Sequence, residues 1–257
     1  NAGNSIASGG NYNVVVGDEA GTAITTGDEN TAIGSEALDA LNTGQYNTAL
    51  GKGTLSSDTK GSQSVAVGAN ALQTQNFTSS TNSLNTAVGY YAGQAVTTGI
   101  SNTLVGGLVG DALTDADYNV AVGYNALTTD TLGSRSIAIG VGTLEVQNFT
   151  SATDVYNVAI GHGAGGAVTT GKQNTLIGGL SGDAITTGEA NTALGYEALG
   201  ATTTANGNVG AGYRSLVANT TGAANTGIGT NALVANTTAS NNVAVGYAAL
   251  DANTTGT

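Results

Sequence analysis

The sequence predicts an all-β parallel β-solenoid, a β-roll or β-helix, of about fourteen 17-residue coils with two 21-residue coils. Three observations predict it. A glycine recurs at a fixed step, the three residues before it alternate branched and small side chains, and the chain has no proline. Proline cannot donate a backbone hydrogen bond, so its absence suits a sheet. We expect a degraded or partial coil in residues 1–12 and a single continuous solenoid over 13–257.

The repeated glycine sets the register. Its steps are 17 residues, except for two steps of 21, from Gly68 to Gly89 and from Gly140 to Gly161. Glycine has no Cβ and so lets the chain bend where a strand ends. The fourteen repeat glycines are Gly17, Gly34, Gly51, Gly68, Gly89, Gly106, Gly123, Gly140, Gly161, Gly178, Gly195, Gly212, Gly229 and Gly246.

With this glycine as position 4, position 0 is asparagine in twelve coils and serine in two, Ser64 and Ser136. Stacked asparagines can pair their side-chain amides from coil to coil. We therefore predict an asparagine ladder. Its members would be Asn13, Asn30, Asn47, Asn85, Asn102, Asn119, Asn157, Asn174, Asn191, Asn208, Asn225 and Asn242.

Positions 1 to 3 predict a short strand in every coil. Position 1 is Thr, Val or Ile, position 2 is usually Ala, and position 3 is Val, Ile or Leu except at Ala211. In a strand, positions 1 and 3 share a face and position 2 points the other way. We expect branched residues such as Val67 and Ile139 to face the core. The alanines would then form an outer column that permits close lateral packing, and the frequent leucine at position 8, as in Leu38, would return to the core.

Both long coils carry the same insert, Gln75–Ser79 and Gln147–Ser151, 72 residues apart, and these hold the only two phenylalanines. Extra residues should leave the coil as a loop. An exposed phenylalanine there is a candidate contact point, although the ring could instead fold back onto the coil. The candidate contact residues are Asn76, Phe77, Asn148 and Phe149.

Five Asn-x-Thr sequons are candidate glycosylation sites. They are Asn76, Asn148, Asn219, Asn236 and Asn253.

Charge and composition limit the function classes. The net charge of -12, from 17 acidic and 5 basic residues, argues against nucleic acid and against anionic lipid. No segment is long and apolar enough to span a membrane, no signal peptide is visible, and the chain starts at Asn1, so we interpret it as a processed or partial chain. The absence of cysteine excludes disulfides and cysteine-ligated metals.

We expect no catalytic residue, no metal and no cofactor. Catalysis on a solenoid would need converging carboxylates or a base, but the acids form no repeated column, and the single His162 takes a place often held by tyrosine. Pairs such as Asp28-Glu29 and Asp115-Ala116-Asp117 are interpreted as turn residues. Threonine pairs such as Thr186-Thr187 recur at one point of the coil. Such a column is similar to an ice-binding face, but the glycine that often follows favours a turn.

The two serine versions, Ser64-Val65-Ala66-Val67-Gly68 and Ser136-Ile137-Ala138-Ile139-Gly140, resemble the S-V-A-I-G repeat of trimeric autotransporter adhesin heads (YadA-like). The asparagine versions, such as the stretch 30–38, are similar to N-T-A-I-G-x-x-A-L repeats of phage and large-virus fibre proteins. The resemblance covers residues 13–250. The adhesin family implies a left-handed β-roll, a homotrimer, and binding to host or matrix surfaces.

From these features we expect a non-enzymatic structural fibre or adhesin-like shaft on a cell or virion surface. It would be extracellular and self-assemble as a lateral homotrimer or a head-to-tail filament, with neither nucleic acid nor membrane insertion. The alternative is a module that binds a receptor, such as a host, matrix or surface glycan, or ice, through the threonine face or the phenylalanine loops.

Overall fold

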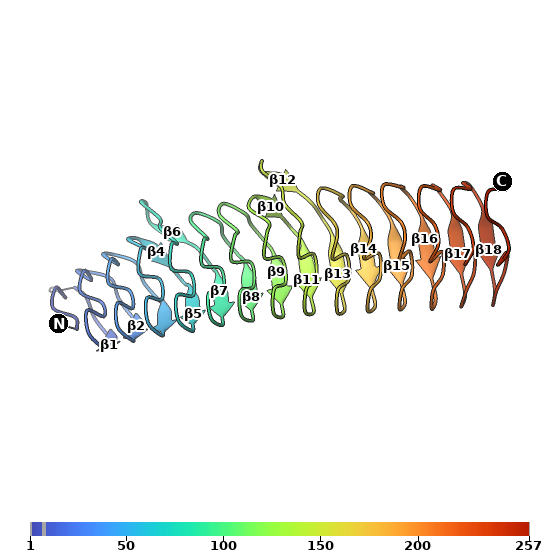
Figure 1. Cartoon of the computed structure of the whole chain (residues 1–257). Coiled ribbons are helices and arrows are strands. Elements are labelled where there is room, and N and C mark those ends of the chain that lie inside the picture. The colour runs from blue at the N-terminus through green and yellow to red at the C-terminus, as the bar shows by residue number, and fades with distance from the viewer. Residues whose placement is uncertain (1, 7–8, 257) are drawn as a thin grey trace. The chain divides into compact units, whose positions relative to one another are not determined.

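The computed structural model describes residues 2–6 and 9–256 and is a parallel β-solenoid of about fourteen coils (Figure 1). Each coil from β1 (Val14–Val16) onward contributes one three-residue strand, and the described residues contain no helix. The predicted all-β solenoid is therefore confirmed. Among those residues, accordingly, there is no helix of the length and apolarity needed to cross a bilayer.

The coils fall into two compact units. The first holds the coils up to Ser134 together with Thr150–Ala152, and its parallel ladder runs in chain order. Its strands are β1, β2 (Thr31–Ile33), β3 (Thr48–Leu50), β5 (Val65–Val67), β7 (Thr86–Val88), β8 (Thr103–Val105) and β9 (Val120–Val122), beside the two-residue strands β4 (Gly61–Ser62), β6 (Thr81–Asn82) and β10 (Gly133–Ser134).

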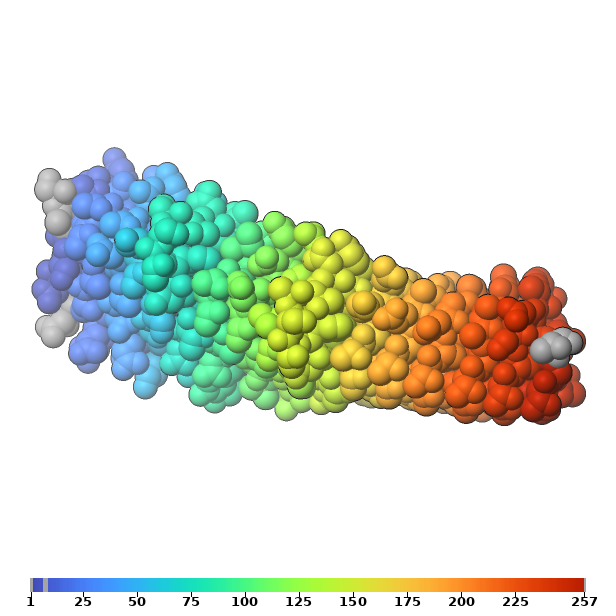
Figure 2. All heavy atoms as spheres, turned by 90° about the horizontal axis from the view of Figure 1, so that it is seen from above, coloured from blue at the N-terminus to red at the C-terminus, as the bar shows by residue number. Residues whose placement is uncertain are grey.

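The second unit holds Arg135–Phe149 and the chain from Thr153 onward, again with a parallel ladder in chain order. Its strands are β11 (Ile137–Ile139), the two-residue β12 (Thr153–Asp154), β13 (Val158–Ile160), β14 (Thr175–Ile177), β15 (Thr192–Leu194), β16 (Val209–Ala211), β17 (Thr226–Ile228) and β18 (Val243–Val245). The space-filling view shows successive coils of each unit closely packed (Figure 2).

The register places equivalent residues over one another, as the repeat predicts. Thr31 pairs with Thr48, Ala32 with Ala49 and Ile33 with Leu50. The same 17-residue offset relates β14 and β15 in the second unit. Each position of the coil therefore becomes a column along the stack.

The face assigned to the strand residues was wrong. The alanines at position 2, such as Ala32 and Ala49, are fully buried, whereas Ile33 is half-buried and Leu50 is exposed. The coil interior is narrow, and position 2 packs against the leucine at position 8 of the preceding coil. A Cβ on Gly210, at position 2, would lie 3.2 Å from Cγ of Leu199. A small residue fits there, so the branched side chains face outward.

The volume of side chains in the core stays similar from coil to coil, because a large residue at position 2 is accompanied by a glycine at position 8. Two coils carry leucine at position 2, Leu104 and Leu176, and both are fully buried. Around Leu104 the position-8 residues are glycines: a Cβ on Gly93 or Gly110 would lie 2.6 or 2.9 Å from a Leu104 methyl carbon. The larger residue at position 2 thus replaces the leucine that position 8 supplies elsewhere.

The repeat glycine has two reasons to be glycine. At Gly34 φ is +138°, a conformation that L-residues with a side chain rarely adopt. A Cβ there would also lie 2.5 Å from the carbonyl oxygen of Gly51 in the next coil. The close stacking of coils therefore excludes a side chain at position 4.

The described part of residues 1–12 contains no strand. Its Gly3 N–H donates to the carbonyl of Ala20 at 2.9 Å. The segment is thus hydrogen-bonded to the first coil without extending the ladder.

Candidate interaction face and the buried polar columns

The predicted asparagine ladder is present and buried. The Asn47 side-chain amide donates to Oδ1 of Asn30 at 3.1 Å and to the Gly61 carbonyl at 2.9 Å, and its backbone N–H donates to the same Oδ1 at 3.0 Å. One side chain therefore ties its coil to the preceding coil and joins the two ends of its own coil. The second unit repeats the pattern between Asn174 and Asn191.

The two serines at position 0 lack this amide, and a glutamine of the same coil replaces it. Gln75 Nε2 donates to Ser64 Oγ at 3.0 Å, and Asn85 donates to Gln75 Oε1 at 2.8 Å. In the second unit Gln147 takes the same place between Ser136, at 3.2 Å, and Asn157, at 2.8 Å. Sequence reasoning missed these glutamines, although each stands eleven residues after the serine that it compensates.

A buried aspartate holds the first insert. Asp58 is 1% exposed, and its Oδ1 accepts from the backbone N–H of Gly61 at 2.9 Å and of Phe77 at 3.2 Å. Its Oδ2 accepts from Gln75 Nε2 at 2.6 Å. Donors on both oxygens satisfy a carboxylate that burial would otherwise destabilise. Asp58 thereby fixes where the insert leaves the coil.

The phenylalanines are not contact residues. Phe77 is 6% exposed and Phe149 is 7% exposed, so both rings fold back onto the coil and the predicted exposed contacts are wrong. Asn76 and Asn148 are half-buried beside them, and Asn76 Oδ1 accepts from the Thr59 hydroxyl at 3.0 Å. What projects from the coil is the short turn that leads into β6 (Figure 1).

Two of the candidate glycosylation sites are inaccessible to solvent in the folded chain. Asn219 and Asn236 are fully buried, and the Asn236 amide donates to Asn219 Oδ1 at 2.9 Å. Asn253 continues the same column, because its side-chain amide donates to Asn236 Oδ1 at 3.2 Å. These residues occupy position 11, the core position that Ile24 and Ile185 hold in other coils. A glycan on a buried amide nitrogen that donates within the core has no room.

The threonine pairs lie in a turn. The first threonine of a pair uses its hydroxyl within the protein: Thr169 donates to the Thr186 carbonyl at 3.1 Å, and Thr186 donates to the Thr203 carbonyl at 3.2 Å. The second threonine, such as Thr187, is exposed, whereas the first is half-buried in every pair except the terminal Thr254-Thr255. The pairs therefore do not make the flat hydroxyl face that ice binding would need.

The acidic residues also act locally. Asp28 and Asp117 accept from the backbone N–H groups of Asn11, at 2.7 Å, and Ile100, at 2.8 Å, which agrees with a turn role. Burial raises the pKa of Asp39, and the Glu36 carboxylate adds to the rise, while burial likewise raises the pKa of Asp183.

Across residues 2–6 and 9–256, no three acidic or histidine side chains gather as a metal site would require. His162 is exposed.

The exposed apolar side chains gather along one part of each coil. Of the large hydrophobic residues that are exposed in the described chain, all but Val146 and Leu250 lie at positions −1, 1, 3 or 5. We name positions 1 and 3 the strand face. We name position −1, just before the buried asparagine, and position 5, just after the glycine, its two margins. No residue of the strand face is charged in any coil.

Tyrosine is concentrated at the margins. In the second unit Tyr196 and Tyr213, both at position 5, stack with ring centroids 5.9 Å apart and planes 11° apart. They are 46% and 49% exposed. A hydrogen bond to Glu197 raises the pKa of Tyr196, and Arg214 Nε lies 3.1 Å from Glu197 Oε2. The stack is thus an ordered surface feature.

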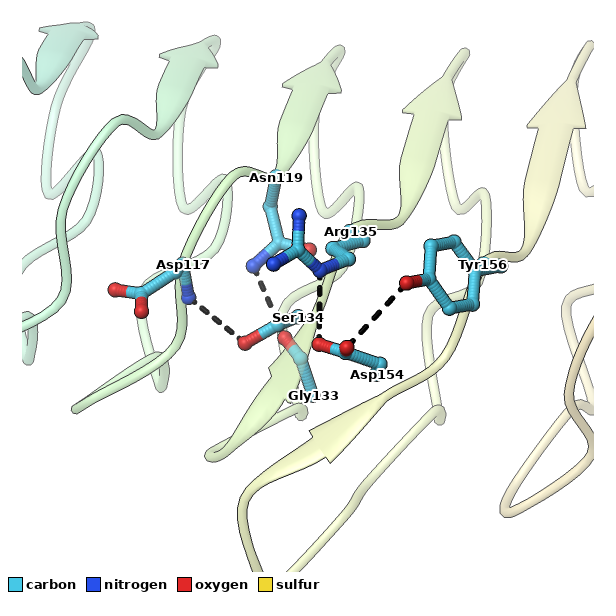
Figure 3. A network of polar contacts seen from close by, with 7 residues as sticks. All are labelled: Asp117, Asn119, Gly133, Ser134, Arg135, Asp154 and Tyr156. Atoms are coloured by element: carbon cyan, nitrogen blue, oxygen red, sulfur yellow. Dashed lines mark hydrogen bonds and ion pairs between the residues drawn. The ribbon is translucent and has the colours of Figure 1, made fainter.

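Polar contacts also hold the opposite margin of the second unit. Arg135 and Tyr156, both at position −1, reach Asp154 of β12 (Figure 3): Arg135 Nε lies 2.9 Å from Oδ1 and the Tyr156 hydroxyl donates to Oδ2 at 3.3 Å. In the first unit, the backbone N–H of Asp117 donates to Ser134 Oγ at 2.9 Å (Figure 3). The insert strand β12 therefore orders margin side chains.

No protein-family model matches the chain, and no curated protein is significantly similar to it. A function can therefore be inferred only from the fold and from the strand face with its margins.

Proposed function

We propose that this chain is a non-enzymatic structural shaft, resembling adhesin-head and viral-fibre repeats, that associates side by side with further copies through its strand face. It would act outside the cell, on a cell or virion surface. The observation that carries the proposal is the uncharged strand face, which places Thr, Val, Ile and Leu outward while Ala fills the core.

The size of the face supports association. With ordinary side-chain areas, its exposed apolar residues and the margin tyrosines present roughly 1,000 Å² in each unit. A standard stable interface buries about 800 Å² per partner. Contiguous apolar patches of this size are uncommon on monomeric proteins. A second copy of the chain offers a flat, uncharged surface of the same kind, which can pack sheet against sheet.

Solution mass with paired charge variants tests this. Leu194 and Ile228, at position 3, are exposed on the strand face. Leu194→Lys with Ile228→Lys should weaken association at least tenfold, because two charges would be desolvated. The matched control, Thr187→Lys with Thr221→Lys, adds the same charge at the exposed turn and should leave the mass unchanged. A wild-type chain that stays monomeric at high concentration would overturn the proposal.

A second candidate is ice binding by the same face. Position 1 brings threonines such as Thr175 and Thr192 into direct register beside Ile177 and Leu194, and this regular array of hydroxyl and methyl groups is what the threonine pairs lack. A thermal-hysteresis assay on the wild-type chain discriminates the two. Ice shaping by a monomer favours this candidate, and its absence removes it.

A further inference from the structure

The two margins of the second unit differ in size in two neighbouring coils, those of Asn191 and Asn208. Position 5 carries the exposed tyrosines Tyr196 and Tyr213 there. Position −1 of the same coils carries the small exposed residues Ala190 and Gly207. In these two coils one edge of the strand face is therefore raised and the other is low.

This asymmetry restricts how two copies can meet. If one copy is turned end for end, like margins meet: tyrosines crowd at one edge, and Ala190 and Gly207 face their own counterparts across a gap. If both copies run the same way, the raised margin of one lies against the low margin of the other in the same coil. In the coils of Asn191 and Asn208, only the second arrangement closes the interface along both edges, and close packing without voids is what stable interfaces require.

We infer that the partner on the strand face is a second copy in parallel orientation with its coils in register, and that the tyrosines at position 5 of one copy pack onto the small residues at position −1 of the other. In this arrangement Tyr196 of one copy meets Ala190 of the next, and Tyr213 meets Gly207. The inference rests on the proposed lateral association and adds its direction and its register.

Charges along the first unit are compatible with the same arrangement. Lys52 and Asp18 stand at position 5, and the residues at position −1 of their coils are Tyr46 and Tyr12. In parallel register each charge would meet a tyrosine of the neighbouring copy and no like charge. A lysine over a tyrosine ring is stabilising by about 0.5–1 kcal/mol at exposed sites.

Disulfide trapping tests the inference, and the chain has no cysteine to interfere. Two differently tagged chains, one Ala190→Cys and one Tyr196→Cys, are co-expressed and mildly oxidised. Each chain then carries a single cysteine, so any disulfide must join two copies.

Heterodisulfides between the two tagged chains are expected, with few homodisulfides of either. Predominant bonding of Tyr196→Cys to itself would overturn the inference although the protein assembles. Only a wild-type chain that is monomeric by mass would overturn the proposed function.

Exchanging the large and the small side chain between positions 196 and 190 supplies a second test, measured as the strength of association. Ala190→Tyr alone and Tyr196→Ala alone should each weaken association about tenfold, one by crowding and one by a cavity. The double variant should recover most of the loss. Equal loss in the double variant, with the fold intact by circular dichroism, would also count against this pairing.

Discussion

The side-chain amide of Asn85 donates to Oε1 of Gln75 at 2.8 Å, so that a glutamine from one coil continues a ladder built of asparagines. The same Gln75 also donates to Ser64 and Asp58. The insert and the serine at position 0 are therefore linked through the hydrogen bonds of one glutamine. A coil can be lengthened where a second side chain restores the buried hydrogen bonds.

Removing Gln75 should destabilise the first unit strongly. Gln75→Ala leaves the buried Asp58 carboxylate and the Asn85 amide each short of a partner, at a cost of about 2–4 kcal/mol. Chemical unfolding followed by circular dichroism measures the change. The control is Gln73→Ala, two residues away and half-buried, where Gln94 Nε2 donates to Oε1 at 3.0 Å, and it should cost well under half as much. Equal costs would refute the ladder role.

A methyl group at the repeat glycine should be far more costly than at a nearby turn glycine. In Gly195→Ala the new Cβ would lie 2.6 Å from the carbonyl oxygen of Gly212 at a φ of +135°, and we expect a loss of about 3 kcal/mol or more. Gly207 also has positive φ, +69°, but nothing lies within 4 Å of its added Cβ. Gly207→Ala should therefore cost only about 1 kcal/mol. Thermal unfolding of the pair gives the comparison.

The inward position of residue 2 predicts unequal truncations within one strand. Leu104→Ala opens a cavity between Gly93 and Gly110 and should cost about 2–5 kcal/mol. Val105→Ala, on the outward face of the same strand, should cost less than about 1 kcal/mol in the dissociated chain. Denaturant midpoints of both variants, measured at low protein concentration, test this. A larger loss at Val105 would restore the opposite orientation.

Acidification should stabilise the fold through Asp39. Because burial and the Glu36 carboxylate raise its pKa above the ordinary 3.8, the folded chain binds this proton more tightly than the unfolded chain. The contribution is complete below the ordinary pKa and disappears as the pH rises through the raised value. Asp39→Asn should therefore raise the melting temperature at pH 7, with a smaller gain near pH 4. Unchanged pH dependence in this variant would exclude the mechanism.

The period, the repeat glycines and the asparagine ladder could be predicted from sequence because the same residue type recurs at the same position of nearly every coil. The orientation of the strand could not be deduced from alternation alone, since alternation shows that Thr31 and Ile33 share a face but not which face is inside. The sequence nevertheless holds the signal that decides this. Where position 2 is the large Leu104, position 8 is the small Gly110. Two positions whose side-chain sizes compensate each other lie in the same core.

The surface exposure expected for Asn219, Asn236 and the two phenylalanines was not found, for a related reason. Asn219 was interpreted as a surface motif, but its register places it with Ile24 and Leu41 in an inward column. Phe77 was interpreted from its hydrophobicity in an insert, and nothing in the sequence shows that Asp58 binds its backbone N–H. Local motifs were weaker guides than position within the coil.

The asparagine ladder also gives the stack a direction. From Asn174 through Asn191 and Asn208 to Asn225, every amide oxygen accepts from the next coil, so the dipoles of these side chains all point the same way. Aligned hydrogen bonds polarise one another, and each coil depends on its neighbours. Losing a mid-column amide should therefore weaken the bonds on both sides of the gap, and the coil nearest an interruption becomes the natural starting point for unzipping.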